Sequence, residues 1–261
     1  MVEELFEELA ELPQVEAIAL GGSRAGTAFD EKSDYDVYLY CTGEIADDVR
    51  NAILKKYCSY IELGNSYWEK EDNCTLKNGI DIDILYRNLD DIAEQVASVV
   101  EQFNAHNGYT TCMWHNIKTC KIVFDNNGRL TQAQKRFDVP YPEKLRQNII
   151  TRNMNLLHGP MPAYDAQIAK AVKRNDKVSI NHRTAAFLES YFDVIFAYNR
   201  LTHPGEKRLV ALCKRDCKAL PRDFEENLNK LFAAMFVNPQ ELKSILTNIV
   251  DNLKDMLGNL H

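Results

Sequence analysis

The chain has 261 residues, 45% of them hydrophobic, with 11 glycines and 8 prolines. This composition excludes a mainly disordered or collagen-like chain and supplies enough apolar side chains for one large domain or two small ones. The formal net charge of −7 divides into −12 over residues 1–140 and +5 over residues 141–261. Two units that face each other across a charged cleft and two differently solvated surfaces both explain this difference.

The N-terminal segment MVEELFEELAEL predicts an acidic amphipathic helix. It lacks the basic start and the apolar run of a secretory signal. No uncharged apolar stretch approaches the roughly 20 residues that a membrane helix needs. We therefore expect a cytoplasmic protein without a membrane segment. The seven cysteines include no CxxC pair and no zinc-finger spacing, so most are expected to be core residues or free thiols.

The first half alternates strand and helix patterns. Residues 15–20 (VEAIAL) predict a strand that ends at Gly21-Gly22, and Ser23 is a suitable N-cap for a brief helix. The residues of DYDVYLY and GIDIDILY alternate as in strands with two different faces. The expected elements that follow the first strand are strand 34–40, helix 44–57, strand 59–68, strand 79–86 and helix 89–103.

The second half predicts helices throughout. Paired prolines in VPYP, at residues 139–142, end regular structure and place a domain boundary near residue 140. Beyond it, six segments between residues 145 and 257 carry apolar residues at helical spacing. The sequence therefore predicts an α+β protein with a mixed-sheet domain at 1–140 and an all-α helical bundle at 141–261.

Three features of the first half fit phosphate chemistry in combination. Gly22 lets the backbone approach a phosphate closely, and Ser23 adds a hydroxyl donor at the start of a helix. Asp34 and Asp36 project from one strand face, where their like charges repel unless a divalent cation neutralises them. With a third carboxylate from a later strand, this set suits one or two Mg²⁺ ions.

The string ALGGSRAGTAFDEKSDYDVYLY, with ten residues between Ser23 and Asp34, resembles the motif of the DNA polymerase β-like nucleotidyltransferase superfamily. The order of an α/β domain and a helical domain is similar to that of bacterial antibiotic nucleotidyltransferases of the aminoglycoside and lincosamide types. The resemblance implies that Gly22 and Ser23 hold the β- and γ-phosphates and that Asp34 and Asp36 ligate the metal ions. Asp81 and Asp83 point the same way, and we prefer Asp83 as the third metal ligand.

The helical half is expected to supply contacts to the nucleotide and to the acceptor. Lys207 and Arg208, which follow a His-Pro-Gly turn, are the first candidates for phosphate contacts, although an ordinary solvated helix start explains them equally well. Asp176 is the preferred general base and Glu189 its alternative, with Glu62 in the first half as a weaker candidate. Asp176 can also be explained as an acid at a helix N-terminus.

The expected function is Mg²⁺-dependent transfer of AMP from ATP to a hydroxyl of a small molecule, with release of pyrophosphate. An aminoglycoside-like antibiotic is one candidate acceptor, which would make the protein a resistance enzyme. The net charge of −7 disfavours a nucleic-acid acceptor. Two alternatives remain, namely an antitoxin that adds AMP to a protein partner and a nucleotide-binding module without turnover.

Overall fold

The computed structural model describes residues 2–25, 33–67, 69–160 and 162–258. The chain divides into two compact units. The first, here called the sheet unit, comprises Met1–Ala97 and Met113–Val139. The second, the helical unit, comprises Ser98–Cys112 and Pro140–His261. Residues 98–112, which precede the expected boundary, thus belong to the helical unit.

The sheet unit contains one mixed sheet. In its described residues the strand order is β3-β4-β5-β2-β1-β6, with β2 and β5 parallel and the other neighbours antiparallel. The strands are β1 (Val15–Leu20), β2 (Tyr35–Cys41), β3 (Cys58–Asn65), β4 (Glu71–Leu76), β5 (Asp81–Arg87) and β6 (Lys121–Asp125). The helices in this part of the chain are α1 (Val2–Ala10), α2 (Asp47–Tyr57), α3 (Leu89–Val100), α4 (Cys112–Thr119) and α5 (Arg129–Phe137).

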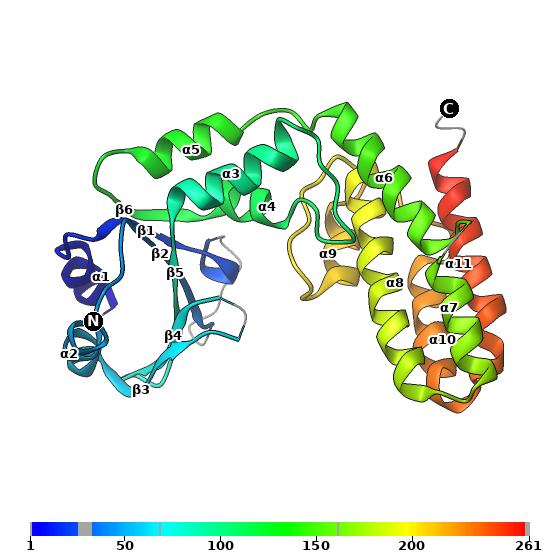
Figure 1. Cartoon of the computed structure of the whole chain (residues 1–261), viewed down its shortest axis with the longest axis horizontal. Helices are drawn as coiled ribbons and strands as arrows, with labels where there is room; N and C mark the ends of the chain where they lie inside the picture. The colour runs from blue at the N-terminus through cyan, green and yellow to red at the C-terminus, as the bar shows by residue number, and fades with distance from the viewer. Residues whose placement is uncertain (1, 26–32, 68, 161, 259–261) are drawn as a thin grey trace. The chain divides into compact units, whose positions relative to one another are not determined.

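One face of the sheet carries a hydrophobic core, and helices α1 and α2 cover it (Figure 1). Val37 and Leu39 of β2 pack there with Ile82 and Ile84 of β5, as the alternation in DYDVYLY and GIDIDILY predicts. The residues between them, including Asp36 and Asp83, therefore lie on the opposite face. Because β2 and β5 are neighbours and point these residues to the same side of the sheet, Asp36 and Asp83 lie together.

Two parts of the sheet unit are not foreseen in the sequence. Strand β4 follows the predicted strand 59–68, and its residues Asp72, Cys74 and Leu76 are buried. The segment 104–140, which carries no clear pattern, forms α4, β6 and α5. There the indole N–H of Trp114 donates to the carbonyl of Phe137 over 2.8 Å, joining α4 to the end of α5.

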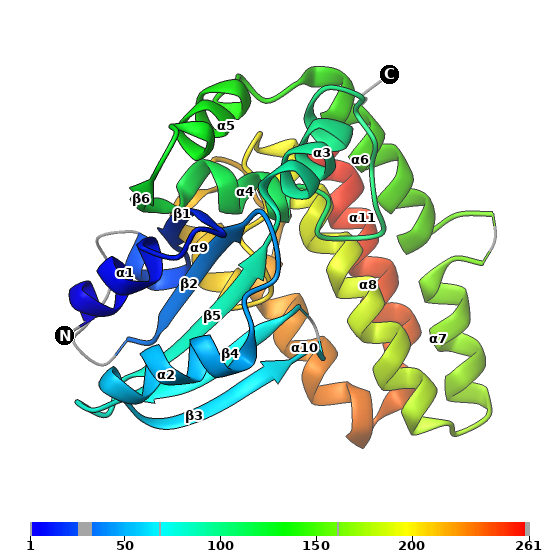
Figure 2. The ribbon, with the colours of Figure 1, turned by 60° about the vertical axis from the view of Figure 1, so that its left-hand side comes forward.

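The helical unit confirms the prediction of an α+β protein whose sheet is followed by helices. Figure 2 shows these helices gathered in one bundle, in which α8 packs against α6 and α7 while α11 packs against α7 and α10. Within its described residues the unit consists of helices and connecting segments. The helices are α6 (Glu143–Leu157), α7 (Tyr164–Lys173), α8 (Lys177–Tyr198), α9 (Leu209–Asp216), α10 (Phe224–Val237) and α11 (Leu242–Leu257), with a short 3₁₀ turn, η2 (Pro239–Glu241). No described helix is long and apolar enough to cross a membrane.

A buried polar network ties residues 98–112 to the helices. Asp193 of α8, 1% exposed, accepts hydrogen bonds from Thr110 N (3.1 Å), Thr110 Oγ1 (2.7 Å) and Asn153 Nδ2 (3.0 Å). Asn153 Oδ1 in turn accepts from Gly108 N over 3.1 Å. Burial raises the pKa of the Asp193 carboxyl to about 7.

The titration of Asp193 predicts a pH-dependent stability. Folded Asp193 keeps its proton up to about pH 7, whereas an unfolded aspartate releases it near pH 4. The free energy of unfolding is therefore expected to fall between about pH 4 and pH 7, by on the order of 4 kcal/mol for this residue. Urea unfolding of the wild type and of Asp193→Asn across this range measures the difference, because the asparagine does not titrate. Parallel pH profiles for the two proteins would contradict the assignment.

Candidate active site

A glycine turn at the end of β1 lies directly against Asp36. Gly21 N donates to the carbonyl of Asp36 over 2.7 Å. Gly22 has φ +52°, and a Cβ there would lie 1.8 Å from Asp36 Oδ2. A Cβ on Gly21 would lie 2.3 Å from Tyr38 Oη. Only glycine allows this approach, so the turn brings exposed backbone next to a carboxylate.

Strand register places Asp36 and Asp83 side by side. The two residues are partners in the parallel β2–β5 ladder, and both side chains are half-buried on the face opposite the hydrophobic core. Asn73 of β4 is the antiparallel partner of Asp83, and its Nδ2 donates to Asp83 Oδ1 over 2.7 Å. On β3, the neighbour of β4, Glu62 is the antiparallel partner of Asn73. The amide of Asn73 thus orients the Asp83 carboxylate beside Asp36.

A further carboxylate, Glu71 of β4, lies near this pair. Burial raises the pKa of Glu71, and the negative charges of Asp83, Glu69 and Asp36 raise it further, against a hydrogen bond from Asn73. We call Asp36, Glu71 and Asp83 the carboxylate face. Its like charges repel one another, and a bound cation would relieve that repulsion.

The remaining predicted residues of the sheet unit lie at the margin of this face. Asp34 is exposed and directly precedes β2, and Asp81 is exposed and accepts from Thr75 Oγ1 over 2.8 Å. Ser23 is exposed in η1 (Gly22–Ala25). The register therefore brings Asp83 next to Asp36 and places Asp81 beside Thr75. Glu62 is exposed and accepts a hydrogen bond from Tyr60 Oη over 3.2 Å.

The site suits Mg²⁺ through two carboxylates. Among the described residues, no group of three His, Cys, Asp or Glu side chains is placed to hold a metal ion. Mg²⁺ is commonly bound by one or two carboxylates together with water and substrate phosphates. Asp36 and Asp83 supply such a pair, and the backbone of the Gly21-Gly22 turn packs against Asp36 where a Cβ would overlap its carboxylate. The donor set therefore fits Mg²⁺ in company with a phosphate ligand.

In the helical unit, the predicted residues have different surroundings. Asp176 is the N-cap of α8, where its carboxylate accepts from Ser179 N (3.0 Å) and Ser179 Oγ (2.7 Å). Those hydrogen bonds lower its pKa. Lys207 is exposed, and Arg208 is the exposed N-cap of α9. Glu189 and Arg208 line a cavity in this unit. The capping contacts explain Asp176 without a catalytic task, and its role as a base stays a prediction.

Three residues of the site are missed by the sequence reasoning. Arg24 is buried, and its guanidinium lies 3.7 Å from the ring centroid of Tyr35 while its Nε donates to the carbonyls of Ser33 (2.7 Å) and Asp34 (3.2 Å). Arg24 therefore holds the backbone of residues 33–35, where β2 begins. Glu71 and Asn73 belong to the strand that is not predicted. The alternation of polar and apolar residues in NCTL, at 73–76, is the one signal in the sequence that points to this strand.

The close packing of Gly22 gives a direct test. Gly22→Ala is expected to destabilise the protein by more than about 1–2 kcal/mol, because alanine is disfavoured at positive φ and its Cβ would overlap Asp36. Gly43→Ala is the matched control, since a Cβ there meets nothing within 4 Å. Its expected effect is within about 0.5 kcal/mol. Chemical denaturation measures both, and equal stability of the two variants would contradict the described contact.

Comparison with known proteins gives distant matches. A family model described as "Domain of unknown function (DUF4037)" matches residues 111–209, a segment that excludes Gly22, Asp36 and Asp83. No curated protein matches the sequence. Among solved structures, the chain is similar to a nucleotidyltransferase-like protein from Exiguobacterium sibiricum 255-15, at 11% identity and a TM-score of 0.44, over 98% of this chain and 74% of that one. It is also similar to an aminoglycoside 6-adenyltransferase from Bacillus subtilis, at 9% identity and a TM-score of 0.32, over 98% of this chain and 90% of that one.

Proposed function

We propose that the protein is a Mg²⁺-dependent nucleotidyltransferase that moves AMP from ATP to a hydroxyl of a small-molecule acceptor. The observation that carries this proposal is the contact of the Gly21-Gly22 turn with Asp36, whose neighbour in the parallel ladder is Asp83. Backbone that can approach a phosphate and carboxylates that can hold a cation are thereby combined at one edge of the sheet. These are the two requirements for binding a metal-nucleotide complex.

The residues of the site have separate tasks in this proposal. Asp36 and Asp83 hold Mg²⁺, with exposed Asp34 as the further ligand that the family resemblance implies. When bound, the ion neutralises phosphate charge and stabilises the leaving oxygen. The Gly22-Ser23 backbone and the Ser23 hydroxyl donate to the β- and γ-phosphates. Asn73 keeps the Asp83 carboxylate oriented through its 2.7 Å hydrogen bond.

In the transfer step, the acceptor oxygen forms a bond to the α-phosphorus while the bond from that phosphorus to the bridging oxygen breaks. Pyrophosphate leaves with the electron pair of the broken bond. The proton of the acceptor hydroxyl passes to a carboxylate of the protein. We assign this proton to Glu71, because it lies near Asp83 and its raised pKa makes it a stronger base than an ordinary glutamate.

The assignment of Glu71 predicts a pH-dependent defect. Glu71→Gln is expected to lower the transfer rate by roughly 10²- to 10⁴-fold, because the glutamine cannot accept the proton. The rise of rate with pH that reports ionisation of Glu71 should disappear as well, while the Kd for Mg²⁺-ATP stays close to that of the wild type. The matched control is Asp176→Asn, whose rate should change little if Asp176 acts as a helix cap. Loss of transfer in Asp176→Asn with normal rates in Glu71→Gln would return the base to Asp176.

The function is tested with ATP labelled at the α-phosphate. The purified chain is incubated with Mg²⁺ and a panel of hydroxyl-bearing small molecules, aminoglycosides among them, and pyrophosphate release and label transfer are measured together. The expected result is Mg²⁺-dependent transfer to at least one small molecule, abolished by EDTA. Label appearing only on protein would identify a protein-modifying enzyme instead. Binding of ATP without release of pyrophosphate across the panel would indicate a binding module.

A further inference from the structure

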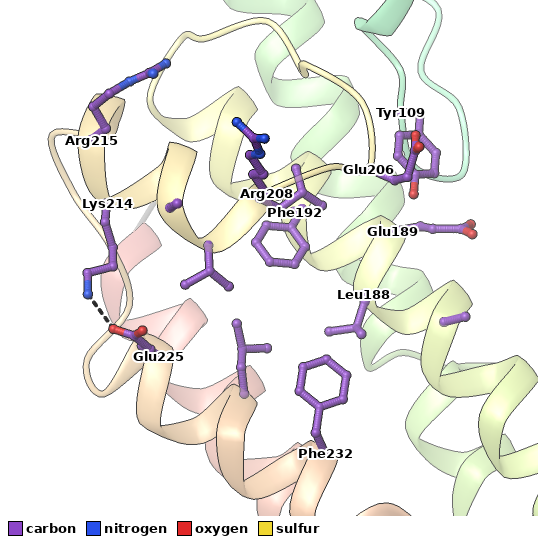
Figure 3. A pocket seen from close by; sticks show the side chains of 15 residues that line it. Tyr109, Leu188, Glu189, Phe192, Glu206, Arg208, Lys214, Arg215, Glu225 and Phe232 are labelled. Atoms are coloured by element: carbon purple, nitrogen blue, oxygen red, sulfur yellow. Dashed lines mark hydrogen bonds and ion pairs between the residues drawn. The ribbon is translucent and has the colours of Figure 1, made fainter. Parts of the chain in front are cut away.

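The helical unit contains a cavity of about 980 Å³ lined by α8, α9, α10 and the segments around residues 109 and 206 (Figure 3). Its volume is at the upper end of the range for small-molecule sites. Leu188 and Phe192 of α8 face Phe232 of α10 across it. Phe232 is 51% exposed where it borders the cavity. The body of the cavity therefore offers apolar surface to a ligand.

One end of this cavity is acidic. Figure 3 shows Tyr109, Glu189 and Glu206 gathered there. The charges of Glu189 and Glu206 raise the pKa of Tyr109 in addition to the effect of burial, so the three groups are close neighbours. In the described residues, neither Glu189 nor Glu206 forms an ion pair with a basic side chain. The Glu189 side chain is half-buried, and burial raises its pKa while the neighbouring His182 lowers it.

The other charged groups of the cavity are mostly neutralised. Lys214 Nζ lies 2.5 Å from Glu225 Oε2, and Arg215 Nε lies 2.7 Å from Asp216 Oδ1. Arg208 brings a further positive charge to the lining. Because Glu225, the further carboxylate of the described lining, already pairs with Lys214, a ligand with several cationic groups would find counter-charges only at the acidic end, where a single cation suffices.

At the acidic end, Tyr109 and Glu189 are held in place by their surroundings, whereas Glu206 is exposed in the segment before α9. Gly108 has φ +81°, and a Cβ there would lie 2.7 Å from Glu189 Cβ, so the segment packs tightly on α8. Tyr109 itself has φ +52°, a strained value for a tyrosine. The hydrogen bonds of Thr110 to Asp193 hold the next residue in place. Tyr109 is thereby positioned beside Glu189 before any ligand binds.

We propose that this cavity binds an amphipathic molecule with a single protonated amine. The apolar body lies against Leu188, Phe192 and Phe232, and the ammonium group lies at Glu189 and Glu206 near the Tyr109 ring. This chemistry excludes a polycationic sugar, which has several charges and little apolar surface. The proposal concerns binding alone and holds whether or not the chain transfers AMP.

Calorimetry with three phenylalkyl probes of equal length tests the charge requirement. Phenylbutylamine is protonated at pH 7.5, phenylbutanol is neutral and phenylbutyrate is anionic. With the full chain, the amine is expected to bind at least tenfold more tightly than the alcohol, and the butyrate more weakly than both. Equal affinity of amine and alcohol, or no binding of the amine, would overturn the proposal.

Variants locate the binding in the cavity. Glu189→Gln combined with Glu206→Gln should weaken amine binding at least tenfold and leave alcohol binding unchanged, while Phe232→Ala should weaken both. Glu226→Gln on α10 is the control, because Glu226 pairs with Lys230 over 2.7 Å and does not line the cavity. Unchanged amine affinity in the double variant, with a normal circular dichroism spectrum, would also refute the site. Asp36→Asn should bind the amine with wild-type affinity, because Asp36 does not line the cavity. Amine binding can therefore be tested independently of whether the chain transfers AMP.

Discussion

Asp36→Asn is expected to lower AMP transfer by at least about 10²- to 10³-fold, the effect of removing one electrostatic contact at a transition state. Asp36 is the central residue of the site, because it contacts the Gly22 turn and is also the partner of Asp83 in the β2–β5 ladder. Asparagine retains the size of aspartate and one oxygen, so the turn can still pack against it. What it loses is the negative charge that holds a divalent cation.

The readouts for Asp36→Asn separate chemistry from folding. Transfer of labelled AMP is measured at saturating Mg²⁺, and the unfolding midpoint in urea is measured on the same sample. The midpoint is expected to stay at or above the wild-type value, because removing one of three neighbouring carboxylates relieves repulsion. Asp83→Asn should reproduce the loss of transfer.

Asp81→Asn is the matched control for this experiment. Asp81 lies on β5 two residues before Asp83, on the same face, but it is exposed and bonded to Thr75. Its substitution should leave the transfer rate within a fewfold of the wild type. If Asp81→Asn were inactive while Asp83→Asn transferred AMP normally, Asp81 would be the metal ligand. Full activity of Asp36→Asn would remove the basis of the proposed function.

The sequence alone predicts the parts of the site that lie on regular strands. The alternation of DYDVYLY and GIDIDILY assigns Asp36 and Asp83 to one face, and β2 and β5 are found at these positions. The choice between Asp81 and Asp83 needs the register of β5 against β2, which depends on side-chain packing across strands and not on local pattern. The hydropathy pattern therefore does not distinguish Asp81 from Asp83, whereas the strand register makes Asp83 the partner of Asp36.

Strand β4 escapes prediction because an aspartate occupies a core position. In EDNCTL, Asp72 lies on the apolar side with Cys74 and Leu76, where a hydrophobic residue is expected. Its burial is possible because Arg50 of α2 reaches it from a distant part of the sequence. Gly64 N and Tyr86 Oη also donate to Asp72, over 2.8 and 2.7 Å. Glu71 and Asn73 are missed with the strand that carries them.

The same buried pair predicts the largest loss of stability in the sheet unit. Asp72→Ala is expected to lower the free energy of unfolding by up to about 3–5 kcal/mol, because it leaves the buried Arg50 guanidinium with only the exposed carboxylate of Asp47 as a counter-charge. Arg50 is 1% exposed and Asp72 is 0% exposed, so water cannot replace the missing carboxylate. Urea denaturation followed by circular dichroism measures the change. An effect below about 1 kcal/mol would mean that the pair is solvated.

Two further variants distinguish loss of the charge pair from loss of packing. Lys70→Ala breaks the exposed pair with Glu44, whose side chains are 42% and 75% exposed, and should cost about 0–1 kcal/mol. Combining Asp72→Leu with Arg50→Met removes both buried charges, and should recover much of the stability lost in Asp72→Ala, since apolar replacements of buried ion pairs are often neutral or stabilising. If the double variant were as unstable as Asp72→Ala, the hydrogen bonds from Gly64 and Tyr86 would be the dominant contribution of Asp72, and β4 would depend on its polar contacts more than on its charge pair.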